Sequence, residues 1–128
     1  MKTATLMMII LTSMTLMAAG NSTVENALPN LERALNSDNH GVVESAIFMS
    51  AKLKLFYPQQ NTESLEKLLD NLTDTGETET IRYKAYLAFQ FMTNATSLAN
   101  IEKEDYKASD QFFRLLADEK ENRLLAQQ

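Results

Sequence analysis

The chain contains 128 residues, with 12 lysines and arginines against 17 aspartates and glutamates, which gives a formal net charge of −5. This acidic balance argues against a nucleic-acid partner, because proteins that bind the phosphate backbone carry clustered Lys and Arg side chains. The chain has no cysteine, so no disulfide can form and an apolar core alone must stabilise the fold. Its length suits a single domain.

The N-terminus has the pattern of a secretory signal peptide. Lys2 supplies a positive charge, residues 4–17 are uncharged and mostly apolar, and Ala18 to Gly20 offer small residues to a signal peptidase. The apolar run is shorter than the roughly 20 residues that a membrane span needs, which favours cleavage over an uncleaved anchor helix. We therefore expect a signal peptide at residues 1–20 and one exported domain at residues 21–128, periplasmic or secreted, with no stable membrane span after cleavage. A cut one residue earlier or two residues later is the alternative.

The exported part consists of predicted helices separated by short polar turns. The first apolar run, from Val24 to Leu35, follows a capping-box pattern and contains Pro29, so the helix either starts at the proline or is kinked there. A second helix is expected at residues 42–57, ending before Pro58. It is apolar on more than one face, which is typical of a central helix. Its main apolar stripe consists of Val42, Ala46, Met49, Leu53 and Phe56.

The third and fourth helices follow the same order. Asn61 or Thr62 is expected to cap the third helix, which has its leucines on one face and its charged residues on the other. A loop is expected at residues 73–79. The fourth helix, expected at residues 80–93, is again apolar on several faces and should also be central. Its main stripe consists of Ile81, Ala85, Ala88 and Met92.

The C-terminal part is polar up to about Tyr106, and a last helix is expected at residues 107–126. The apolar residues of this helix, Phe112 and Phe113 among them, are concentrated near its start. No segment of the chain alternates with period two, so a sheet is not expected. The sequence therefore predicts an all-α fold of about five helices.

An internal repeat relates the first four helices. A shift of 37 residues superimposes leucines of the first helix on those of the third, and a shift of 39 superimposes the second helix on the fourth. An amphipathic helix followed by a more buried one is the pattern of helix pairs stacked into a solenoid. Residues 31–53 and 68–92 resemble HEAT-type α-helical repeats in unit length and residue order, and Pro29, Asp74 and Arg82 also suit that pattern. The resemblance implies a short solenoid of antiparallel helix pairs whose second helices line a concave, partner-binding side. An irregular four- or five-helix bundle is the alternative.

The only histidine, His40, is flanked by Asp38 and Glu44, a grouping that would suit a general base or a metal ligand. A metal site, however, usually needs three or four ligands. A helix cap at Asp38 or Asn39 followed by a solvated His40 explains the pattern more simply. No nucleophile elbow or glycine-rich phosphate loop is present. We therefore expect no catalytic residue, no bound metal, no cofactor and no enzymatic activity.

Aromatic and cationic side chains supply the candidate site. They lie on the helices at residues 42–57 and 80–93, away from the main stripes, and such mixed surface is typical of interface anchors. The alternative is that they pack against the last helix or the loop after Asn94. The sequence thus predicts an exported, non-enzymatic helical-repeat module that binds a protein or peptide; a small periplasmic helical-bundle inhibitor, chaperone or accessory subunit is the alternative. The candidate partner-binding residues are Phe48, Lys52, Tyr83, Lys84, Leu87 and Phe91.

Overall fold

The computed structural model describes residues 24–128, so the predicted signal peptide and its cleavage site lie outside the described residues. The chain divides into two units after Asn30, and residues 24–30 of the first unit are helical.

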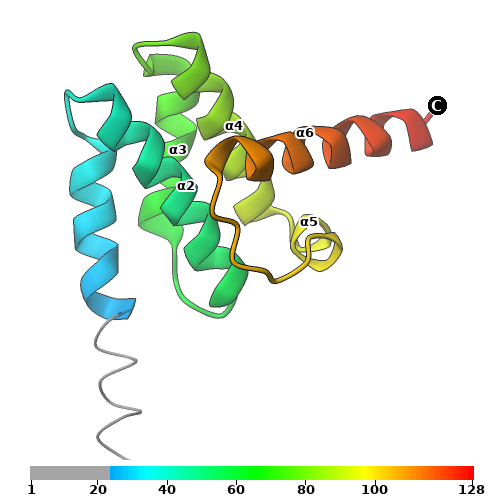
Figure 1. Ribbon diagram of the computed structural model, residues 1–128, viewed down its shortest axis with the longest axis horizontal. Helices are drawn as coiled ribbons and strands as arrows, with labels where there is room; N and C mark the ends of the chain where they lie inside the picture. Colours follow the sequence, from blue (N-terminus) through cyan, green and yellow to red (C-terminus); the bar gives the residue numbers. More distant parts are fainter. Residues whose placement is uncertain (1–23) are drawn as a thin grey trace, which may run out of the picture. The chain divides into compact units, whose positions relative to one another are not determined.

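The described part of the chain is helical, with no strand between residues 24 and 128, which confirms the predicted all-α fold. Six helices are present in this range, one more than the sequence predicts. The first spans residues 24–35 and runs through Pro29. Every helix in this range is too short or too polar to span a membrane. The other five are α2 (His40–Phe56), α3 (Glu63–Thr75), α4 (Glu79–Thr93), α5 (Ala95–Asn100) and α6 (Ser109–Ala126) (Figure 1).

Side-chain caps fix the starts of α2 and α4. Asn39 Oδ1 accepts a hydrogen bond from the backbone N–H of Val42 at 3.2 Å, and α2 therefore begins at His40, two residues before the predicted start. Thr78 Oγ1 accepts from the N–H of Ile81 at 3.1 Å in the same way. Both helices begin with three or four backbone N–H groups that have no partner inside the helix, and each cap satisfies one of them.

The helix α3 continues to Thr75 and α4 begins at Glu79, so the predicted loop at residues 73–79 is too long by three residues at its start and one at its end. The hydroxyls of Thr73 and Thr75 donate to backbone carbonyls four residues earlier, which removes their competition with the helix. The remaining turn is tight at Gly76. A Cβ atom there would lie 2.8 Å from the carbonyl oxygen of Leu72 and 2.8 Å from a methyl group of Ile81, so only a hydrogen atom fits.

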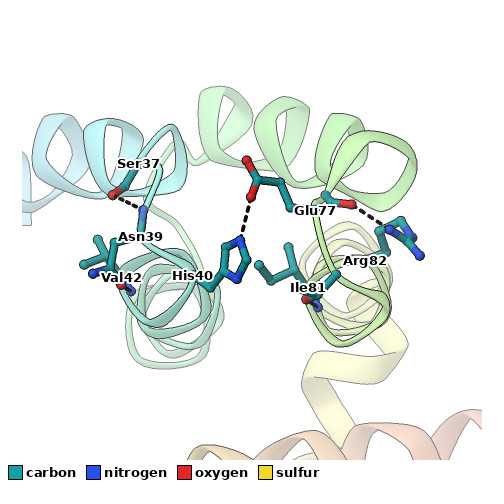
Figure 2. Close-up of polar contacts among 9 residues, drawn as sticks. Ser37, Asn39, His40, Val42, Glu77, Ile81 and Arg82 are labelled. Carbon is teal, nitrogen blue, oxygen red and sulfur yellow. Dashed lines mark hydrogen bonds and ion pairs between the residues drawn. The ribbon is translucent and has the colours of Figure 1, made fainter.

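The helix α4 is central, as predicted, because it contacts α2, α3, α5 and α6. Its neighbour α2 runs in the same direction. His40 faces Glu77 just before α4 (Figure 2), and Glu44 pairs with Lys84 further along both helices. The short turn after α3 returns the chain antiparallel, and α3 packs on α4 as well (Figure 1). The predicted stripe of α4 is buried at all four positions: Ile81, Ala85, Ala88 and Met92.

The predicted stripe of α2 is wrong at four of its five positions, because only Ala46 is buried. Val42 is 42 % exposed and Met49 is 48 % exposed, although the 39-residue shift equates them with buried residues of α4. Together with Leu31 and Ala34 they line an open groove that neither α4 nor α6 covers. The buried side of α2 meets this groove at Ala46, which also lines it. This buried side consists of Val43, Ala46, Ile47, Phe48, Ser50, Ala51 and Leu55.

The connection between α4 and α6 contains the helix α5, which the sequence analysis does not predict. Asn94 Oδ1 accepts from the N–H of Thr96 at 3.0 Å and caps it. The helix has six residues and none of them is buried, so it lacks the apolar stripe by which a helix is recognised in a sequence. Residues 101–108 then form neither helix nor strand, with extended backbone at Ile101 and Ala108, and α6 begins at Ser109, two residues after the predicted start.

Candidate functional site

The structure brings five of the six candidate partner-binding residues onto one side of α2 and α4. We call this the α2/α4 face; Tyr83, the sixth residue, lies outside it and is 55 % exposed. The face is apolar at its centre and carries two lysines whose side chains are only 16 % and 15 % exposed. Its residues are Phe48 and Lys52 from α2 and Lys84, Leu87 and Phe91 from α4.

The α2/α4 face is covered by residues 101–116 of the same chain, which we call the C-terminal segment. The ring of Phe112 lies between Phe48 and Phe91, with centroid distances of 5.6 Å and 5.7 Å. Tyr106 packs on Phe112 at 5.2 Å, and Phe113 packs on it at 5.6 Å. Edge-to-face and tilted contacts of this kind add to the stabilisation from buried apolar area. These five residues form the aromatic cluster of the protein.

Burial in this cluster corrects the expectation of an open docking surface. Phe48, Leu87 and Phe91 are buried, because α6 and the connection before it pack on them. For these three residues the structure therefore shows the alternative arrangement, packing against the last helix. Lys52 and Lys84 are largely covered as well. Whether a separate partner binds at this face stays a prediction.

The two lysines connect the face to acidic residues of the chain. Lys52 Nζ donates to Asp105 Oδ1 at 2.8 Å and to the carbonyl of Tyr106 at 3.2 Å. The hydrogen bond and the charge of Lys52 hold the pKa of Asp105 below its ordinary value. Lys84 Nζ lies 3.2 Å from carboxylate oxygens of both Glu44 and Asp110.

Each lysine also lies over an aromatic ring. The Nζ atom of Lys52 is 5.3 Å from the ring centroid of Phe48, and that of Lys84 is 5.5 Å from the ring centroid of Phe113. These distances are within the range of cation–π attraction. The face therefore places two cations beside the space between the Phe48 and Phe91 rings, which we call the aromatic slot. This arrangement suits a ligand that carries carboxylates next to aromatic side chains.

The extended part of the C-terminal segment is held by side chains. Ile101 and Tyr106 are buried, whereas residues 102–105 between them are exposed. The hydroxyl of Tyr106 donates to the carbonyl of Glu102 at 3.1 Å, and burial raises the pKa of this hydroxyl. The backbone N–H of Tyr106 bonds locally, to the carbonyl of Glu104. The run therefore lies across α2 without the repeated backbone hydrogen bonds of a helix or a sheet.

A pocket of about 200 Å³ extends the face between α4, α5 and α6. Leu87 and Phe91 belong to both the face and the pocket, and Arg123 lines its other side. Glu119 Oε1 accepts from Asn100 at 2.8 Å and from Arg123 Nε at 3.1 Å. The hydrogen bond from Asn100 is the main cause of the lowered pKa of Glu119. The Nη2 atom of Arg123 is buried without a hydrogen-bond partner.

No protein-family model, curated protein or solved structure matches the chain.

The histidine that the sequence analysis considered for chemistry lies away from this face, at the start of α2. His40 Nε2 is 2.5 Å from Glu77 Oε2, and both side chains are exposed (Figure 2). The Glu44 carboxylate pairs with Lys84. Among residues 24–128 no group of three or more His, Asp or Glu side chains is arranged to hold a metal ion. The contact links the start of α2 to the turn before α4, and the expectation of no enzymatic activity stays a prediction.

The residues that sequence analysis missed are those of the C-terminal segment. Asp105, Tyr106, Phe112 and Phe113 complete the face. The one signal for them was that the apolar residues of the last helix are concentrated near its start, which indicates that only this part is covered. Packing of the candidate residues against the last helix was the alternative in the sequence analysis, but nothing local in the sequence selects it over an open face.

Proposed function

We propose that residues 21–128 form an exported, non-enzymatic helical-repeat module, similar to HEAT-type repeats, that binds a protein or peptide partner on the α2/α4 face. The observation that carries this proposal is that the face already holds a stretch of polypeptide, the C-terminal segment, part extended and part helical. A surface that binds one peptide segment through a slot and two cations has the chemistry to bind another.

The arrangement of the helices supports the repeat part of the proposal. The helices α2 and α4 are parallel, and α3 is antiparallel to α4. This is the order expected when helix pairs stack side by side. In such a stack the second helices of neighbouring pairs form one continuous surface. The α2/α4 face is a surface of this kind, and its anchors come from both helices.

One observation favours the alternative, a helical accessory subunit or inhibitor. Leu124 and Leu125, near the end of α6, are 54 % and 58 % exposed, and the buried residues of α6 all lie in its first half. Exposed leucines at the end of a helix suit a contact with a larger protein. This contact would not involve the α2/α4 face, so the position of binding separates the two functions.

The test uses peptide selection followed by site-directed crosslinking. A random peptide library is selected on the mature chain, residues 21–128. Because the chain has no cysteine, a photocrosslinker can be attached at one introduced thiol, at Tyr83→Cys beside the face or at Lys67→Cys on α3 as a matched exposed control. Selected peptides should crosslink from position 83 and not from position 67. Equal crosslinking, or crosslinking only from a thiol at Leu125, contradicts binding at the face.

Export is tested separately by the N-terminus of the exported chain. When the full sequence is expressed in a bacterium, the periplasmic or secreted product should begin at Asn21. A product that keeps Met1 and stays in the cytoplasm contradicts the predicted signal peptide.

A further inference from the structure

We propose that the C-terminal segment is a built-in competitor for the α2/α4 face, and that the partner is an acidic peptide segment of the same chemistry that displaces it. Such a partner carries an aromatic residue next to a carboxylate in an extended stretch, followed by a helical turn with two further aromatic residues. This inference rests on the proposed function and adds to it the chemistry of the partner and the regulation of the site.

The chemistry of the partner follows from what the segment places on the face. Phe112 fills the slot between Phe48 and Phe91 and is completely buried. Tyr106 and Phe113 also contact this ring, at centroid distances of 5.2 Å and 5.6 Å. If the segment left, the slot would be open to water, and only aromatic side chains would restore the tilted ring contacts that it makes.

The charge of the partner follows from the two lysines. Both hydrogen-bond acceptors of Lys52, Asp105 Oδ1 and the Tyr106 carbonyl, belong to the C-terminal segment. Lys84 would keep Glu44 but would lose Asp110. A largely covered ammonium group without a carboxylate is unfavourable, so a ligand that replaces the segment must bring acidic groups of its own.

The way in which the segment is held makes it displaceable. Asp105 and Asp110 are exposed, and ion pairs with exposed carboxylates are weak. The extended run lacks repeated backbone hydrogen bonds to α2, and the second half of α6 contributes no buried residue. The buried side chains of the segment are confined to Ile101, Tyr106, Phe112, Phe113 and Leu116. A segment anchored at a few points can open locally at a lower free energy than the whole domain.

Competition within the chain sets the apparent affinity for the partner. A tethered segment acts at an effective concentration of the order of millimolar, and the partner binds only the fraction of molecules in which the segment is open. Loosening the segment without touching the face should therefore strengthen binding of an added peptide. This behaviour separates a competitor from a segment that is simply part of the core.

The experiment measures binding of a fluorescent peptide with the sequence of residues 101–116 to the mature chain. The wild-type chain should bind it weakly. The double variant Asp105→Asn, Asp110→Asn loosens the segment in the protein while the peptide keeps its own carboxylates, and it should bind about three- to tenfold more tightly. The double variant Asp118→Asn, Glu121→Gln removes the same number of charges at exposed sites of α6; it is the matched control and should bind like the wild type.

Each outcome decides one part of the argument. Equal affinity of the Asp105→Asn, Asp110→Asn variant and the Asp118→Asn, Glu121→Gln control, with both folded by circular dichroism, overturns the competitor. If library-selected peptides crosslink from position 83 but the 101–116 peptide neither binds nor competes with them, this inference fails while the proposed function stands. Crosslinking away from the face removes the proposed function itself. A wild-type dimer that the peptide dissociates would assign the face to a second copy of the chain and overturn a separate partner.

Hydrogen exchange gives a second readout that does not depend on any variant. When a selected peptide binds the wild-type chain, the amides of residues 109–116 should exchange faster, because the segment is released. Unchanged or slower exchange in these residues overturns displacement.

Discussion

The substitution Phe112→Ala tests the packing of the aromatic cluster most directly. Phe112 is completely buried, and its ring contacts those of Phe48, Phe91, Tyr106 and Phe113 at centroid distances between 5.2 Å and 5.7 Å. Alanine would remove the only ring that touches all the others. The cavity left behind would be lined by aromatic rings that come from three separate parts of the chain.

The expected cost follows from burial. A buried Phe→Ala change usually destabilises by about 3–5 kcal/mol. Four ring contacts favour the upper part of that range, because each aromatic pair adds about 0.5–1.5 kcal/mol beyond area burial. A small domain has a free energy of unfolding of about 5–15 kcal/mol, so the variant should stay folded with much of its stability lost. The loss of stability cannot exceed the free energy needed to open the C-terminal segment. Once the segment is open, residue 112 makes no packing contacts, and the substitution has no further effect on stability.

Urea unfolding followed by circular dichroism measures the free energy of unfolding, and trypsin measures opening of the segment. Lys103, Lys107 and Arg114 supply cleavage sites within the segment. Cleavage there should be faster in Phe112→Ala, whereas Phe56→Ala, at an exposed phenylalanine of α2, should leave both measurements close to the wild type. A loss below about 1 kcal/mol, of the size expected for a surface substitution, with unchanged cleavage would refute the packing described for the cluster.

Three further predictions concern single sites. Ala88→Asp should unfold the domain in a thermal melt, because Ala88 is completely buried in α4 and the carboxylate would have no partner; a melting temperature near the wild type would contradict this burial. Thr62→Val should raise the free energy of urea unfolding by about 1 kcal/mol, because the buried Thr62 hydroxyl has no hydrogen-bond partner; a loss of stability would mean that the hydroxyl is satisfied. Acid should loosen the C-terminal segment. Since Lys52 lowers the pKa of folded Asp105, the Asp105 contribution is complete above about pH 4, where the unfolded chain titrates, and is lost as pH falls through the lower folded value. Near-UV circular dichroism of the aromatic rings should show this step, and Asp105→Asn should remove it; identical acid profiles would count against the assignment.

The buried face of a helix could be predicted from the sequence where the spacing of its apolar residues alone identifies the buried positions. In α4 the four-residue and three-residue spacing identifies Ile81, Ala85, Ala88 and Met92 as buried, and they are. In α2 the apolar residues nearly encircle the helix, so the spacing alone could not decide that Val43 and Ile47 face inward while Val42 and Met49 face water. That choice depends on which elements cover the helix.

The sequence predicts the site residues that come from α2 and α4, but not those that come from the C-terminal segment. Phe48 and Phe91 stand out because they lie off the main stripes, and both do form one face. Their actual neighbour, Phe112, is distant in the sequence, and the intervening connection has no periodic pattern from which its path could be derived. A contact of this range comes from tertiary packing, which single-sequence patterns do not record.

The turn at Gly76 fixes how closely α3 and α4 approach at their closed end. Because a Cβ atom there would meet Leu72 and Ile81, any other residue at this position would push the two helices apart. The connection from Asn94 to Ala108 is longer and mostly exposed. Its length can therefore change without altering the surface of α2 and α4 that a ligand meets, and under the proposed competition such a change would adjust how often that surface is free.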